Sequence, residues 1–181
     1  MVDFNSNFRY NIPMITLYLD MDGVLADFNK AYTKYDPHKD DRKKFRSSVM
    51  EYKIFEHLDF MPDTQELLNH VCRLNGITIE ILTSLGTHEP VQGEEAKRQK
   101  LKWLNAKNIP YKANFVRNKE EKAKYATPNS ILVDDSSGCI GPFIAAGGHG
   151  ILHSHSSETI RIIDSTILQL RAIEALRGNY A

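Results

Sequence analysis

Short apolar runs alternate with helical patterns along most of this chain, and that alternation limits the folds open to it. Five apolar or β-rich runs have the length of strands: Ile15–Leu19 and residues 77–82, 113–116, 130–133 and 150–152. Between them, helical patterns cover residues 64–74, 94–106 and 119–126. Strands that alternate with helices favour βαβ units. We therefore predict a parallel five-stranded sheet with helices on both faces, in the strand order 5-4-1-2-3.

Residue types at the helix ends support these assignments. Asp63 and Glu66 have the spacing of a capping box at the start of the first long helix, and Gly76 is a stop signal after it. A last helix, residues 157–176, is predicted to pack against the core, because its apolar residues recur at helical spacing: Ile160, Ile163, Ile167, Leu170, Ile173 and Leu176.

One interval is too long for a simple crossover. Residues 29–60 separate the first two predicted strands and include the polar stretch DPHKDDRKKFR. We interpret this segment as a small helical cap inserted into an α/β core formed by residues 1–28 and 61–181. The alternative is a long crossover helix with a charged, solvated face.

Composition excludes several classes of protein. The chain has 181 residues and a formal net charge of zero, so it is long enough for one sizeable core and carries no excess charge for coating nucleic acid or membranes. Cys72 and Cys139, expected in a helix and a loop, need no disulfide at this size. Together with the absence of a signal sequence or a long apolar run, this predicts a soluble, cytoplasmic protein with no stable nucleic-acid partner.

Acidic residues follow two of the predicted strands. Asp20 and Asp22 follow the first strand, and Asp134 and Asp135 end the fourth. In an open α/β sheet, ligands bind outside the carboxyl ends of the strands where the strand order reverses, and strands 1 and 4 are neighbours at that point. The four carboxylates would repel one another unless a cation compensates, and an oxygen-rich site without thiols suits Mg²⁺.

Each acidic pair also has a structural explanation. Asp22–Gly23 is a common turn dipeptide, and Asp134–Asp135 could cap the following helix. Two strands that both end in acids make a shared site the better interpretation.

Hydroxyl and ammonium groups extend the predicted site. Thr83 and Ser84 end the second strand, where they could donate hydrogen bonds to a phosphate oxygen, although threonine also suits a strand. Transfer of a phosphoryl group needs a fixed positive charge nearby, and AKRQKLKWL supplies several lysines.

The chain resembles the haloacid dehalogenase (HAD) superfamily of phosphohydrolases in four motifs: DMDGVLADF, ILTS, a lysine three residues before a tryptophan (Lys100 and Trp103), and ILVDD. More narrowly it is similar to the 5′(3′)-deoxyribonucleotidases and their short bacterial and phage relatives. The likeness spans about residues 15–152.

This resemblance implies a Mg²⁺-dependent hydrolysis of nucleoside 5′-monophosphates, especially deoxyribonucleotides, through an aspartyl-phosphate. Asp20 would be the nucleophile and Asp22 the acid/base. Mg²⁺ would be bound by Asp20, the backbone carbonyl of Asp22, and Asp134, with Asp135 beside them.

The resemblance also assigns the groups that contact the substrate. Thr83 and Ser84 would bind phosphate, and Lys100 would neutralise phosphate and nucleophile. In many HAD proteins that lysine lies just before the fourth strand, in the region of Lys119, Lys122 and Lys124. The alternative interpretation of these three lysines is that they form a solvated helix face. Phe28 and Phe55 would line a pocket for the base; their alternative is core packing.

The chain departs from the family at two points, which leaves the choice of substrate open. Ser136 and Ser137 follow Asp135 where the mammalian enzymes have an arginine, and the cap is shorter and more charged. Alternatives are a phosphatase for another small ester or a nucleic-acid 3′-phosphate, and a noncatalytic HAD-like binding module. His149, His153 and His155 could form a soft-metal site, but solvent-facing polar residues are the better interpretation.

Overall fold

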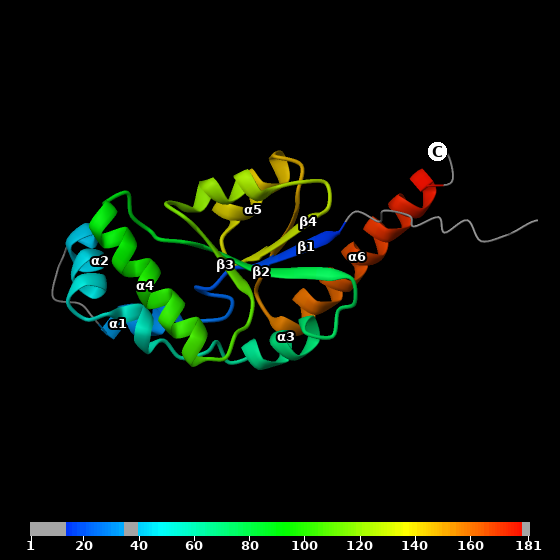
Figure 1. The fold of residues 1–181 in the computed structure, drawn as a ribbon. Helices are drawn as coiled ribbons and strands as arrows, with labels where there is room; N and C mark the ends of the chain where they lie inside the picture. Colours follow the sequence, from blue (N-terminus) through cyan, green and yellow to red (C-terminus); the bar gives the residue numbers. More distant parts are fainter. Residues whose placement is uncertain (1–13, 35–39, 179–181) are drawn as a thin grey trace, which may run out of the picture.

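The computed structural model describes residues 14–34 and 40–178 as a five-stranded parallel sheet with helices on both faces (Figure 1). The strands are β1 (Ile15–Leu19), β2 (Ile77–Ser84), β3 (Lys112–Val116), β4 (Ser130–Asp134) and β5 (His149–Leu152). Their order in the sheet is β3-β2-β1-β4-β5. This is the predicted order read from the other edge, so the predicted α/β fold is confirmed.

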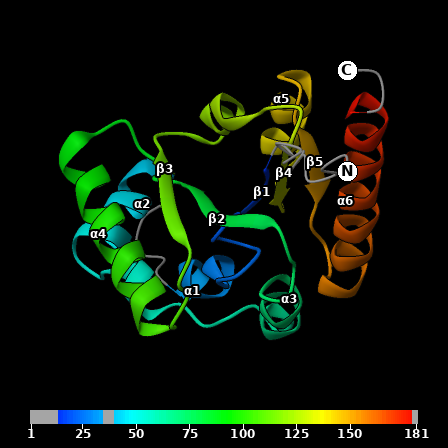
Figure 2. The same cartoon turned by 45° about the vertical axis from the view of Figure 1, so that its right-hand side comes forward.

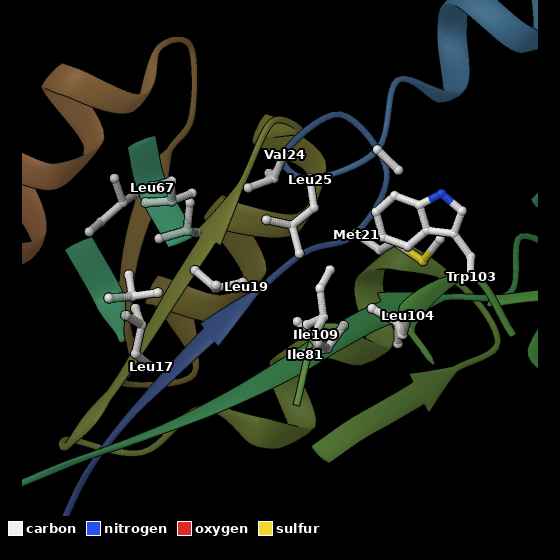
Figure 3. Packing of buried hydrophobic residues seen from close by; sticks show 14 of the residues in the cluster. Leu17, Leu19, Met21, Val24, Leu25, Leu67, Ile81, Trp103, Leu104 and Ile109 are labelled. Carbon is white, nitrogen blue, oxygen red and sulfur yellow. The ribbon is translucent and has the colours of Figure 1, made fainter. Parts of the chain in front are cut away.

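Alternation along the strands divides the core between the two faces of the sheet. On β1, Ile15, Leu17 and Leu19 belong to the larger hydrophobic cluster, whereas Tyr18, between them, packs into the smaller one on the other face. Figure 3 shows the larger cluster, in which Trp103 lies beside Met21. The central strands are therefore buried on both faces, as expected for a parallel sheet.

Different helices supply the two faces. Helices α3 (Thr64–Val71), α4 (Pro90–Ala106) and α6 (Ser156–Gly178) contribute apolar residues to the larger cluster. Helix α5 (Ser137–Ala145) and the 3₁₀ helix η2 (Lys119–Tyr125) cover the other face. Figure 2 shows α4 and α6 at opposite ends of the sheet. Among the described residues, no helix combines the length and the apolar character needed to cross a membrane.

Two local predictions were wrong. The carboxylate of Asp63 makes no capping bond within α3 and instead accepts a hydrogen bond, 2.6 Å long, from the backbone N–H of Ser156 at the start of α6. Cys139 lies inside α5 and not in a loop, because the helix begins directly after the acidic end of β4. Both cysteines are free thiols.

The segment between β1 and β2 is helical where the structure describes it. It contains α1 (Phe28–Lys34), α2 (Asp41–Met50) and a 3₁₀ helix, η1 (Ile54–His57). These elements lie next to α4 at one end of the sheet (Figures 1 and 2). The Gln99 side chain, on α4, accepts from the N–H of Phe55 at 3.3 Å and donates to the carbonyl of Val49 at 2.8 Å. The division into core and cap stays a prediction, and parts of its ranges, residues 1–13, 35–39 and 179–181, lie outside the described residues.

Candidate active site

The loop after β1 brings Asp20 to the carboxyl edge of the sheet. The Asp20 N–H donates to the carbonyl of Val133 on β4 at 2.9 Å, so the β1–β4 pairing continues to this residue. Gly23 has φ +83°, and a Cβ there would lie 2.1 Å from the Asp135 carboxylate. Only glycine allows this turn and this close approach together, so Asp22–Gly23 is both a turn and part of the site.

Three carboxylates converge at this edge. Asp20, Asp134 and Asp135 each offer one oxygen, and these oxygens lie within 4.8 Å of one another. An all-oxygen donor set of this kind fits Mg²⁺, which in proteins takes a few carboxylates and keeps several waters. The predicted ligands from β1 and β4 are thus together, whereas the Asp22 carboxylate is not part of the group.

Lys122 is buried between two of these acids. Its ammonium lies 2.8 Å from Asp20 Oδ1 and 2.6 Å from Asp134 Oδ2, and its side chain is 1% exposed. The interpretation of these lysines as a solvated helix face is therefore wrong for Lys122. Lys119 and Lys124 are exposed, in agreement with that interpretation. Burial opposes the charge of Lys122, yet Asp20 and Asp134 outweigh it and raise the pKa of the ammonium.

Lys100 contacts Asp22. Its buried ammonium donates to Asp22 Oδ2 and, at 2.8 Å, to Thr83 Oγ1. The second oxygen of that carboxylate, Asp22 Oδ1, is buried and has no hydrogen-bond partner among the described residues. Burial raises the pKa of Asp22, and Lys100 offsets this only in part. The Asp22 carboxyl therefore takes up a proton more readily than a solvated aspartate does.

The carboxyls on β4 are also shifted toward their neutral forms. Burial and then the charge of Asp20 raise the pKa of Asp134, with partial compensation by Lys122. Asp135 is an exposed residue, but loss of water around its carboxyl and then the charges of Asp20 and Asp134 raise its pKa to about 6. The cluster thus holds more negative charge than Lys122 alone compensates, a condition that a bound cation relieves.

An aromatic cluster lies beside Lys100. The Phe55 ring centroid is 4.5 Å from the Lys100 ammonium, and the Phe28 ring stacks on Phe55 at 5.5 Å with an interplanar angle of 19°. Phe55 is 2% exposed, which agrees with the alternative interpretation that it packs in the core, whereas Phe28 is partly buried. Tyr32 and Phe45, which the sequence analysis did not single out, complete the cluster.

The remaining predicted residues, Ser84 and the three histidines, lie outside the group of acids. Ser84 ends β2 next to Thr83 and lines a separate groove. The three histidines do not share a metal group within the described ranges. His153 is buried, with its Nδ1 2.8 Å from Thr159 Oγ1, so the solvent-facing interpretation was wrong for this residue.

Two solved structures resemble this fold. A haloacid dehalogenase-like family hydrolase from Xanthomonas campestris matches 88% of this chain and 94% of its own, with a TM-score of 0.58 and 10% sequence identity. A hydrolase from Streptococcus pneumoniae matches 83% of this chain and 98% of its own, with a TM-score of 0.51 and 16% identity. No family model and no curated protein matches the sequence. The likeness establishes that the chain has the fold of haloacid dehalogenase-like hydrolases.

Proposed function

We propose that this protein is a Mg²⁺-dependent HAD phosphatase that hydrolyses nucleoside 5′-monophosphates, deoxyribonucleotides in particular. The observation that carries the proposal is the division of two carboxylates between two lysines. Asp20 pairs with Lys122, and Asp22 pairs with Lys100. A binding module would have no need of two separately controlled carboxylates.

Asp20 is suited to attack phosphorus. Its contact with Lys122, 2.8 Å from Asp20 Oδ1, orients one oxygen of the carboxylate. As that carboxylate bonds to phosphorus, the ester P–O bond breaks and its electron pair passes to the leaving oxygen. The product of this step is an aspartyl-phosphate on Asp20.

Asp22 is suited to move the proton. In the first step it gives a proton to the leaving oxygen; in the second it takes one from the water that attacks the aspartyl-phosphate, and free phosphate and the Asp20 carboxylate result. Its raised pKa and its partnerless Oδ1 favour this role. Thr83, bonded to Lys100, would contact a phosphate oxygen, with Ser84 next to it.

The lysine beside the nucleophile is assigned from geometry. Lys122 contacts Asp20, so we assign the neutralising role to Lys122, whereas the sequence favoured Lys100. Lys100 instead orients Asp22 and Thr83. Asp20, Asp134 and Asp135 would hold Mg²⁺, which when bound offsets the charge of the phosphate and of the attacking carboxylate.

Phosphate release measures this function directly. Nucleoside monophosphates, sugar phosphates and p-nitrophenyl phosphate are each incubated with the protein and Mg²⁺. We expect release to stop on chelation and to return with Mg²⁺, with deoxyribonucleotides hydrolysed fastest. Release that is unchanged by chelation contradicts the metal role, and no release from any ester contradicts a phosphatase.

The nucleotide preference rests on Phe28. Phe28, Tyr32 and Phe45 are the partly buried rings of this cluster, and of these Phe28 stacks on Phe55, whose ring lies against the Lys100 ammonium, so Phe28 is the ring that we expect to contact a base. Stacking contributes roughly 1–3 kcal/mol per base in single-strand binders, so Phe28→Ala should lower kcat/KM for dTMP by about tenfold or more. Deoxyribose 5-phosphate, which has the same sugar without the base, is the control and should lose little. Equal losses on both substrates contradict base stacking.

A further inference from the structure

A groove lies beside Ser84, outside the cluster of acids. It has a volume of about 270 Å³ and is lined by residues of three segments, the end of β2, the end of β3 and the start of η2: Ser84, Gly86, Thr87, His88, Arg117, Asn118, Lys119 and Glu120. No residue of this groove other than Ser84 has a role in the hydrolysis proposed above.

Strand pairing places the basic side of the groove next to Ser84. Ser84 pairs with Val116 in the parallel β2–β3 ladder, and the Leu85 N–H donates to the Val116 carbonyl at 2.8 Å. Arg117 directly follows Val116, so it leaves the same edge of the sheet as Ser84. Thr83, the residue before Ser84, bonds to Lys100, and the groove is therefore continuous in sequence with the reaction centre.

The two cations of the groove, Arg117 and Lys119, differ from the other basic residues nearby in whether an acid binds them. Within the described part of the chain, the Arg117 guanidinium and the Lys119 ammonium have no hydrogen bond or ion pair, although Arg117 lies in the field of Glu121. By contrast, Lys122 is bound by two acids and Lys124 pairs with Glu121.

Local contacts hold this basic segment in place. The Arg117 backbone N–H donates to Glu121 Oε2 at 3.1 Å, and Asn118 Oδ1 caps η2 by accepting from the Glu121 N–H at 3.1 Å. The Lys119 ammonium lies 2.8 Å from the position that a Cβ on Gly138 would take, so the glycine leaves it room. The backbone is thus fixed while both cationic groups stay available.

We propose that this groove binds a second phosphate group on the substrate, so that the preferred substrate is a nucleoside 3′,5′-bisphosphate. The proposal rests on the phosphatase function proposed above. Arg117 can bind a phosphate through two parallel N–H···O bonds, and Lys119 adds a second positive charge. Glu120 contributes a single negative charge, so the two cations outweigh its repulsion of an anion. With one phosphate at Asp20, the groove beside Ser84 accepts the other.

Binding to a protein that cannot turn over tests the proposal. Calorimetry with Asp20→Asn measures Kd for dTMP and for thymidine 3′,5′-bisphosphate. We expect the bisphosphate to bind about tenfold more tightly or better, because charged hydrogen bonds contribute more than neutral ones. Adding Arg117→Gln and Lys119→Gln should bring the ratio of the two Kd values close to one.

Arg73→Gln, added to Asp20→Asn, is the matched control. Arg73 is exposed and lies between α3 and β2, at the opposite edge of the sheet, so this variant should keep the preference for the bisphosphate. Equal Kd values in the parent protein, no binding of the bisphosphate, or a preference that survives loss of both cations overturns the proposal. Release of phosphate from p-nitrophenyl phosphate by the protein with Asp20 intact reports separately on the phosphatase function.

Discussion

At the scale of single residues, the proposed mechanism separates attack on phosphorus from proton transfer. Asp20 and Asp22 are two positions apart in sequence, yet Lys122 contacts the first and Lys100 the second. Burial raises the pKa of Asp22, whereas Asp20 shares the Lys122 ammonium with Asp134. Neighbouring acids can take different roles when their surroundings move their proton affinities apart.

Replacing Asp20, the proposed nucleophile, tests this division. Asp20→Asn should keep the fold, because an amide oxygen can still accept from the Met21 N–H and Lys122 retains Asp134. Hydrolysis should fall by about a thousandfold or more, because an amide does not attack phosphorus. Phosphate release and circular dichroism measure the two effects. Asp41→Asn, at an exposed acid on α2, is the control, and near-normal turnover by folded Asp20→Asn would refute the assignment.

The buried lysine gives a prediction about stability. Lys122→Met leaves Asp20 and Asp134 without their shared cation, and breaking a buried ion pair from one side costs about 3–5 kcal/mol. We expect a loss of this size in the free energy of unfolding in urea without metal. Lys124→Met removes an exposed lysine two residues away and should cost less than about 1 kcal/mol. Similar losses for both variants would show that the contacts of Lys122 are energetically unimportant.

Sequence reasoning brought the acids together but favoured Lys100 over Lys122, the lysine that contacts Asp20. The acids directly follow apolar strands, so the parallel topology alone predicts that Asp20 and Asp134 meet. Lys119, Lys122 and Lys124 share one short polar segment, and nothing local distinguishes the one that is buried. That distinction depends on how η2 packs against α5, β2 and β3.

At the scale of elements, Asp63 joins the start of α3 to the start of α6. Its carboxylate accepts from the Ser156 N–H, and its carbonyl accepts from the Ser156 hydroxyl at 3.0 Å. His155 Nδ1 lies 3.5 Å from the same carboxylate. Burial alone would raise the pKa of Asp63, but the bonds from Ser156, and the nearby His153, hold it below its usual range. The residue thus caps a helix that begins 93 positions later.

This contact predicts a pH-dependent contribution to stability. Asp63→Ala should lower the free energy of unfolding by about 1–2 kcal/mol at neutral pH, as loss of a helix cap does. Because the folded-state pKa is depressed, the contribution of the wild-type residue is present above about pH 4 and is lost as the pH falls through that lower pKa. Urea unfolding at several pH values measures it.

Asp63→Asn is the control for titration. It keeps an oxygen that can accept from Ser156 but cannot gain a proton. The difference in the free energy of unfolding between Asp63→Asn and Asp63→Ala should therefore not depend on acid pH. A difference between the wild type and the alanine variant that does not change below pH 4 would contradict the proposed role of this carboxylate.

Element types were easier to predict than their ends or their long-range bonds. All five strands formed where apolar runs predicted them, because buried parallel strands need continuous apolar residues. The capping box failed since Asp63 and Glu66 have the right spacing but the carboxylate bonds to a distant helix. Burial of Phe55 likewise depends on Gln99 and α4, which no local pattern reveals.

At the scale of the whole molecule, the parallel sheet gathers acids from distant parts of the chain. Strands β1 and β4 are neighbours where the strand order reverses, and their carboxyl ends bring together Asp20, Asp134 and Asp135. Apolar clusters on both faces of the sheet fix the two strands. The fold therefore holds these like charges together although they repel one another, and a cation that binds them should stabilise the whole fold.

Metal binding should accordingly raise global stability. A ligand that binds only the folded state adds about 2.7 kcal/mol at a concentration one hundred times its Kd. We expect Mg²⁺ to raise the midpoint of thermal unfolding relative to protein in chelator, and Asp135→Asn to abolish most of that rise. Asp135 suits the test because it is the exposed member of the three carboxylates, so its replacement leaves the packed core and the contacts of Lys122 in place. Asp41→Asn, at an exposed acid outside the group of three carboxylates, should keep the full rise. If Asp135→Asn keeps it too, Asp135 does not bind the metal, and if the wild type shows no rise at saturating Mg²⁺, the three carboxylates are not a metal site.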